Sequence, residues 1–230
     1  MKYPAAVVIC FALALPGAVP AADVPGPKTE KERIGYSLGM DIGNTLRKQS
    51  VEVDADSLAR GFKDSYSGGK TLLTEEESRK EIQNLQQKLA ERQAAAMRQQ
   101  AEKNKADGEK FLAENRKKEG VKTLPSGLQY KVLKEGTGKS PKASDSVTTH
   151  YRGTLIDGTE FDSSYKRGEP ATFPVSGVIA GWTEALQLMK EGSKWQLFLP
   201  PNLAYGERGA GRDIGPNATL VFEVELISVK

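Results

Sequence analysis

The sequence predicts an α+β protein: an all-helical N-terminal module and a long connecting helix, followed by a twisted antiparallel sheet wrapped on one short helix. Three observations support this prediction. Residues 28–124 contain no proline, and their apolar residues recur at helical spacing. After Gly120, short runs of alternating apolar and polar residues are separated by turn residues, which is typical of strands. One helical pattern, near Trp182 to Met189, lies among those strands.

Residues 1–21 have the pattern of a secretory signal peptide. Lys2 precedes an apolar run from Ala5 to Leu15, and small residues follow up to Ala21. The run is shorter than the roughly 20 apolar residues that span a bilayer, so it does not predict a membrane anchor. Cleavage after Ala21 would leave a cysteine-free chain, which suits an oxidising compartment. We therefore expect an exported protein, in the periplasm or associated with the outer membrane.

Residues 22–73 predict a small helical module. Four apolar residues recur at four-residue spacing: Ile34, Leu38, Ile42 and Leu46. Three glycines run beside them at the same spacing: Gly35, Gly39 and Gly43. Because each glycine weakens a helix, we expect close approach of another helix, with a loosely formed helix as the alternative. Asp54 or Asp56 caps a second short helix that ends at Ser67-Gly68-Gly69.

Residues 74–119 predict a long connecting helix. It should run from about Glu75 toward Asn115, with Gly108 as the only breaker. Its apolar stripe fades after Leu89, so we expect the later half to be a solvated rod. Since the short helices before it bury little alone, we interpret the N-terminal module as pairing with another copy; a monomeric helical appendage is the alternative.

Residues 120–230 predict the sheet domain. Alternating apolar and polar residues occur in four runs, at 128–132, 147–151, 195–199 and 220–226. Asp157-Gly158 lies between two extended segments and predicts a tight hairpin turn. The strands should therefore be antiparallel, with one face of the sheet in water.

Composition excludes several classes of function. The 33 lysines and arginines against 30 aspartates and glutamates give a net charge of only +3, which argues against a nucleic-acid partner. One cysteine, Cys10, and one histidine, His150, remove most routes to a metal site, to disulfides and to His-based nucleophilic catalysis. We expect no metal and no cofactor.

A set of aromatic and apolar residues in the C-terminal half needs an explanation: Tyr151, Phe161, Phe173, Val178, Ile179, Trp182, Tyr205, Ile214 and Phe222. They could form only the core of a small sheet, and periodicity does not decide this. Short motifs surround them: His150-Tyr151-Arg152-Gly153, Asp157-Gly158-Thr159-Glu160-Phe161-Asp162-Ser163-Ser164, Val178-Ile179-Ala180-Gly181-Trp182, Ala204-Tyr205-Gly206 and Ala218-Thr219-Leu220-Val221-Phe222. In that order, over residues 122–230, they resemble the FKBP-type peptidyl-prolyl cis-trans isomerases.

The rest of the chain is similar to the macrophage-infectivity-potentiator subgroup of exported bacterial isomerases. The matching segments are Tyr36-Ser37-Leu38-Gly39, Ala59-Arg60-Gly61 and Leu124-Pro125-Ser126-Gly127-Leu128-Gln129-Tyr130. The resemblance implies an FKBP-like fold, a homodimer formed through the N-terminal helices, and isomerisation of X–Pro bonds, with chaperone activity. The implied partners are proline-containing polypeptides that are unfolded or partly folded.

The resemblance also implies a role for each of eleven residues. Trp182 would form the floor on which the prolyl ring sits. The implied catalytic residues are Tyr151, Phe161, Asp162, Tyr205 and Phe222, and the other substrate-binding residues are Arg167, Phe173, Val178, Ile179 and Ile214. The Tyr205 hydroxyl and the Ile179 N–H would hold substrate carbonyls. Since rotation about an X–Pro bond breaks no covalent bond, we expect Asp162 to orient Tyr151 and Arg167 rather than to act as an acid or base.

Three positions depart from the best-known members of the family: Ala171, Gly177 and Ala210. They bear on the affinity for a rapamycin-like macrolide inhibitor and on the preferred residue before proline. Residues 120–230 contain every pocket residue, so this segment alone should fold and isomerise short peptides. The alternative functions are a non-catalytic chaperone or adhesion-type binding module that uses the same apolar pocket, and a structural dimer whose C-terminal domain only docks partners.

Overall fold

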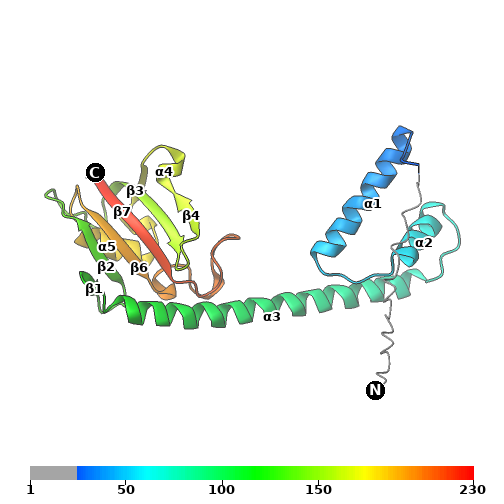
Figure 1. Ribbon diagram of the computed structural model, residues 1–230, viewed down its shortest axis with the longest axis horizontal. Coiled ribbons are helices and arrows are strands. Elements are labelled where there is room, and N and C mark those ends of the chain that lie inside the picture. The colour runs from blue at the N-terminus through cyan, green and yellow to red at the C-terminus, as the bar shows by residue number, and fades with distance from the viewer. Residues whose placement is uncertain (1–24) are drawn as a thin grey trace, which may run out of the picture. The chain divides into compact units, whose positions relative to one another are not determined.

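A computed structural model describes residues 25–230 of the chain (Figure 1). The predicted signal peptide, residues 1–21, lies outside the described residues. The chain divides into two compact units after Glu75. Within residues 25–230, no helix combines the length and the apolar character needed to cross a membrane.

The first unit contains the two predicted short helices, α1 (Glu30–Lys48) and α2 (Ala55–Tyr66). Thr29 and Glu32 form a capping box at the start of α1, and Asp54, not Asp56, caps α2 by accepting a hydrogen bond from the Ser57 N–H at 2.7 Å. Neither helix has a buried residue. A Cβ built on the three glycines of α1, Gly35, Gly39 and Gly43, would meet nothing within 4 Å. The expected close helix approach is therefore not made within the described chain.

The helix α3 (Glu75–Asn115) is continuous over the range that the sequence predicts. Residues 91–100 are exposed on every side, as expected for a solvated rod. The rod prediction is wrong for residues 101–115, where the helix packs on the sheet domain. The Phe111 ring lies 6.0 Å from the Phe198 ring. The buried Asn115 side chain donates a hydrogen bond to Gln129 Oε1 at 3.0 Å.

Gly108 allows a close approach and does not break α3. A Cβ built on Gly108 would lie 2.3 Å from Thr219 Oγ1 and 3.2 Å from Thr219 Cβ. Both residues are buried. Glycine is therefore required here because any side chain would push the helix away from Thr219.

Gly108→Ala is expected to destabilise the sheet domain. In an open helix this substitution stabilises by about 0.5–1 kcal/mol, because alanine has the higher helix propensity. Here the overlap with Thr219 should reverse the sign, for a net loss of about 1–3 kcal/mol in the free energy of unfolding. Urea unfolding measures it. Adding Thr219→Ala should restore most of the loss, and a Gly108→Ala chain more stable than wild type would contradict the contact.

The second unit is built on one seven-stranded sheet (Figure 1). In chain order its strands are β1 (Val121–Thr123), β2 (Gln129–Lys134), β3 (Ser146–Leu155), β4 (Glu160–Ser163), β5 (Ala171–Pro174), β6 (Lys194–Leu199) and β7 (Leu220–Val229). The spatial order is β1-β2-β6-β7-β3-β4, β5 also pairs with β3, and all pairs are antiparallel. The four predicted runs fall on β2, β3, β6 and β7, which confirms them as strands.

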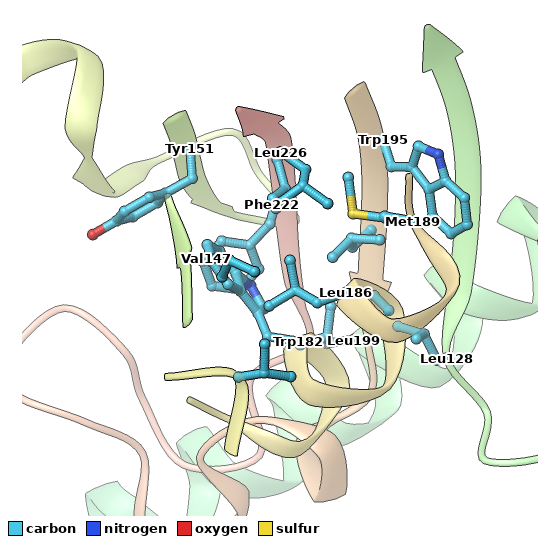
Figure 2. Close-up of a cluster of buried hydrophobic side chains, with 14 of the residues drawn as sticks. Leu128, Val147, Tyr151, Trp182, Leu186, Met189, Trp195, Leu199, Phe222 and Leu226 are labelled. Carbon is cyan, nitrogen blue, oxygen red and sulfur yellow. The ribbon is translucent and has the colours of Figure 1, made fainter. Parts of the chain in front are cut away.

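The core lies between this sheet and the helix α5 (Ala180–Leu188). Along β7, burial alternates with the period of two that strands impose, so Phe222, Val224 and Leu226 face inward. Figure 2 shows Phe222 and Leu226 near Trp182 and Leu186 of α5. The predicted single helix among the strands is thus present, together with the one-turn helix α4 (Ser164–Arg167).

The strand β3 changes partner along its outer edge. Its residues 146–149 pair with β5, and its residues 152–154 pair with β4. Between them, the buried Ser164 hydroxyl accepts a hydrogen bond from the Tyr151 N–H at 2.7 Å and donates one to the Tyr151 carbonyl at 3.2 Å. On this outer edge a side chain therefore takes the place of a strand partner at Tyr151, whose other edge pairs with Val224 of β7.

The hairpin predicted at Asp157-Gly158 joins β3 to β4. Gly158 has a φ of +88°, which the turn requires and which favours glycine. The Asp157 carboxylate accepts a hydrogen bond from the Thr159 N–H at 2.9 Å. The turn returns the chain so that Phe161 and Asp162 lie beside β3.

Candidate functional site

A cavity of about 650 Å³ brings together ten of the eleven residues singled out in the sequence. They are Tyr151, Phe161, Asp162, Phe173, Val178, Ile179, Trp182, Tyr205, Ile214 and Phe222. Arg167 does not line the cavity; it lies behind Tyr151 and Asp162 and contacts both. The residues come from β3, β4, β5, the start of α5, the loop after β6, and β7.

Trp182 has aromatic rings on three sides. It is the third residue of α5 and is 4% exposed. Tyr151, Phe173 and Phe222 meet its indole edge-on or face-on, at centroid distances of 5.2, 6.0 and 5.3 Å and interplanar angles of 83–88°. Edge-to-face packing of this kind is favourable and fixes ring orientation. The indole is therefore a rigid apolar floor.

Phe161, on β4, adds a further aromatic ring beside Phe222 and forms a wall of the cavity. Its ring stands nearly perpendicular to that of Phe222, at 5.5 Å. A Cβ on Gly153 would lie 2.6 Å from the Phe161 ring and 2.8 Å from the Phe222 ring, so only glycine leaves room for both. This gives a physical reason for the glycine in the His150-Tyr151-Arg152-Gly153 motif.

A polar corner closes one end of the cavity. The Tyr151 hydroxyl donates a hydrogen bond to Asp162 Oδ2 at 2.6 Å and accepts one from Arg167 Nη2 at 2.7 Å. Arg167 Nη1 donates to Asp162 Oδ1 at 2.5 Å. The one turn of α4, capped by Ser163, returns Arg167 to Asp162, five residues earlier. In Figure 2 the Tyr151 hydroxyl points away from the other labelled side chains.

These contacts fix the charge state of the corner. Burial alone would raise the pKa of Asp162, but hydrogen bonds from Tyr151 and Arg167 more than offset it and hold the pKa below the ordinary value. Burial, and then the hydrogen bond to Asp162, raise the pKa of Tyr151. At neutral pH, Asp162 is therefore an anion and Tyr151 is neutral. Neither group is poised to exchange a proton.

Two hydrogen-bond donors at the cavity have no partner among residues 25–230. They are the Tyr205 hydroxyl and the backbone N–H of Ile179. Tyr205 is 40% exposed, and Ile179 stands just before the first turn of α5, where its carbonyl accepts from Trp182. Both donors are thus available to carbonyl oxygens of a bound chain.

Two residues that line the cavity, Gly211 and Asp213, were not among those predicted from the sequence. Both belong to the loop from Gly206 to Ala218 that also carries Ile214 and Ala210. Ala210 and Ile214 exchange backbone hydrogen bonds of 2.8 and 3.2 Å, which form the loop into a small hairpin. A turn-rich segment between two recognised motifs was the only available signal. Of the three departures, Gly177 and Ala210 line the cavity, and Ala171 lies outside its lining.

The contacts of His150 indicate a structural role. Its Nδ1 lies 3.0 Å from the Ser164 hydroxyl, and its ring stacks on Tyr165 at 4.6 Å. It does not line the cavity.

Comparisons with known proteins agree with this geometry. A family model described as FKBP-type peptidyl-prolyl cis-trans isomerase matches residues 137–227. A second, described as the domain amino terminal to FKBP-type peptidyl-prolyl isomerase, matches residues 31–132. Together they extend from α1 to β7.

Individual relatives match most of the chain. The outer membrane protein MIP of Legionella longbeachae is 47% identical over 230 residues, covering 100% of this chain and 99% of that protein. The peptidyl-prolyl cis-trans isomerase Mip of Coxiella burnetii is 48% identical over 203 residues, 88% of each chain. The crystal structure of FkpA from Escherichia coli has a TM-score of 0.73 at 41% identity, covering 88% of this chain and 98% of that one. The chain therefore belongs to the FKBP-type peptidyl-prolyl cis-trans isomerases.

Proposed function

We propose that this chain accelerates cis–trans isomerisation of X–Pro bonds in exported polypeptides. The observation that supports this most is the aromatic cavity on the Trp182 floor, which has two unpartnered donors at its edge. A prolyl ring would lie on the indole. The carbonyls beside it would accept hydrogen bonds from the Tyr205 hydroxyl and the Ile179 N–H.

The chemistry needs no nucleophile. Amide resonance opposes rotation about the X–Pro bond with a barrier of about 18–20 kcal/mol. The twisted amide has lost the charge separation of the planar form, so an apolar cavity that excludes water favours it. Each ~1.4 kcal/mol of that preference gives about a tenfold higher rate. The aromatic walls hold the ring while the chain turns about it.

The direct test measures isomerisation of short X–Pro peptides by purified chain that lacks residues 1–21. Tyr205→Phe removes one donor and keeps the ring, so it should lower kcat/KM by about two- to tenfold, the value of one hydrogen bond. Tyr165→Phe is the matched control, because Tyr165 lies outside the cavity. If the wild-type chain does not accelerate isomerisation above the uncatalysed rate, the proposal fails and the alternative of a non-catalytic binding module is favoured.

Asp162→Asn is expected to reduce kcat/KM less than tenfold. The amide keeps the shape of the carboxyl and can still bond to Tyr151, whereas loss of a true general acid or base costs about 10²–10⁴-fold. A fall within that larger range, in a folded chain, would show that Asp162 takes part in proton transfer. The peptide assay and circular dichroism together decide between the two.

The pH dependence of stability gives a second readout for this variant. The folded pKa of Asp162 lies below the ordinary 3.8, so its contribution to stability is present above about pH 4 and is lost as the pH falls through the folded pKa. Asp162→Asn should remove this part of the acid destabilisation. Urea unfolding at neutral pH and below pH 4 measures the difference.

We also propose that the first unit is a dimerisation module. Its apolar residues have no cover within the described chain: Ile34, Leu38 and Ile42 of α1 are 45–59% exposed, and Phe62 of α2 is 62% exposed. A second copy would bury these residues, and the glycines of α1 would let two helices approach closely. The homodimer would hold two cavities for one client chain.

Sedimentation tests the dimer. Gly39→Leu places a bulky side chain on the glycine face and should shift the full chain toward monomer, whereas Ser37→Leu, on the opposite face of α1, should not. Both residues are exposed in the structure. The monomeric variant should isomerise peptides normally but refold a proline-limited protein more slowly, because two linked sites act at a raised effective concentration. A monomeric wild-type chain would contradict the proposal.

Export rests on the pattern of residues 1–21. We expect cleavage near Ala21, which mass spectrometry of the chain from the cell envelope would detect. An intact chain that begins at Met1 and lies in the cytoplasm would contradict export.

A further inference from the structure

The last turns of α3 form a stripe of contacts with the loop that overhangs the cavity. Gln100, Asn104 and Gly108 recur every four residues and therefore share one face of the helix. The Asn104 side chain donates a hydrogen bond to the Pro216 carbonyl at 2.8 Å. One turn later, Gly108 lies in close contact with Thr219.

The loop backbone lies directly on this face. A Cβ built on Gly215 would come within 2.8 Å of Gln100 Nε2 and 3.0 Å of Asn104 Nδ2. Gly215 follows Ile214, which reaches into the cavity and is 9% exposed. The helix thus holds the loop at the residues adjacent to its pocket contact.

The loop has two other kinds of attachment. Ile214 is part of the hydrophobic core, and Ala210 and Ala218 pack against that core. The Asn217 N–H donates to the Gly206 carbonyl at 2.9 Å and closes the base of the loop. The Ala210–Ile214 pair is internal to the loop and does not fix its place on the domain. Among residues 25–230, the hydrogen bond from Asn104 is therefore the polar attachment that ties the loop, beyond its base, to the rest of the domain, and it acts two residues from Ile214.

We propose that Asn104 is a positioning residue for the isomerase reaction: it sets the loop from Gly206 to Ala218 over the cavity through its hydrogen bond to Pro216. This inference rests on the proposed isomerase function. Asn104 touches no substrate and acts through Ile214 and its neighbours. The unit that carries the reaction would accordingly include the part of α3 from Gln100 onward, in addition to the predicted domain of residues 120–230.

Two variants test the role of the Asn104 N–H. Asn104→Asp keeps the shape of the side chain but removes the donor, and Asn104→Ala removes both. We expect each to lower kcat/KM for X–Pro peptides by about two- to tenfold. Asn84→Ala, exposed on the same helix far from the loop, is the control and should match wild type.

Hydrogen exchange gives a readout that a general loss of stability would not reproduce. In both variants the amides of Ala210 and Ile214 should exchange faster, while those of β6 and β7 keep wild-type rates. Faster exchange throughout the sheet, or faster loop exchange with unchanged kcat/KM, would overturn the proposal. So would wild-type behaviour of Asn104→Asp in both assays. If the wild-type chain shows no isomerase activity, the proposed function fails, and the exchange rates still report whether Asn104 holds the loop.

Discussion

Phe222→Ala is expected to lower kcat/KM for X–Pro peptides by about ten- to a hundredfold. The ring is 4% exposed and packs against both the Trp182 floor and the Phe161 wall. Its loss removes apolar contact with the prolyl ring, worth about 1.5–3 kcal/mol, and frees two neighbouring rings to move. The peptide assay on folded protein measures the effect.

The same substitution should also cost about 3–5 kcal/mol of stability, because it leaves a cavity in the core. Leu226→Ala separates the two effects. Leu226 lies four residues further along β7, on the same buried face, but does not line the cavity. Its truncation should destabilise by about 2–5 kcal/mol and leave kcat/KM near wild type. If both variants lose the same activity, the effect of Phe222→Ala on kcat/KM is due to lost stability and not to lost contact with the substrate.

Removal of all of α3 is expected to have the second large effect. A chain of residues 120–230 retains every strand and every pocket residue, and sequence patterns predict that it folds and acts alone. We expect this shorter chain to be less stable, because Phe198 would lose the Phe111 ring and Gln129 would lose its bonds to Asn115 and to the Leu112 carbonyl. Loss of a packed aromatic residue alone costs about 3–5 kcal/mol.

Thermal unfolding of two truncated chains measures this loss. Residues 76–230 form the second compact unit and keep all the α3 contacts with the sheet domain. The chain of residues 120–230 should melt about 12 °C or more below it and isomerise peptides more slowly, because the loop also loses Asn104. Equal melting temperatures and rates would show that α3 is dispensable for the domain.

The sequence predicted those elements whose own residues determine them. The apolar period of four identifies α1, the alternation of β7 separates its buried face from its wet face, and Asp157-Gly158 specifies the turn between β3 and β4. In each case a local pattern and the tertiary environment favour the same structure.

The end of α3 could not be predicted in this way because its contacts are made by polar and small residues. Gln100, Asn104 and Asn115 are residues that a hydropathy pattern assigns to solvent, and Gly108 is one that it assigns to a helix break. The partners of Asn104 and Gly108, Pro216 and Thr219, lie more than 100 residues further along the chain, and Asn115 bonds to Gln129 across the intervening β1. Likewise, the aromatic residues of the cavity have the sequence pattern of a hydrophobic core. Only the order of their motifs indicated that they form a pocket.

The divided outer edge of β3 also limits how other polypeptide chains can pair with the sheet. An unfolded chain adds readily to any long, unpaired strand edge. Here β4 and β5 cover β3 in two pieces of four residues each, interrupted at Tyr151, and the opposite margin of the sheet is the three-residue β1. Neither margin of this sheet therefore offers a long run of unpaired backbone groups, so another polypeptide has little opportunity to add to the sheet as a further strand.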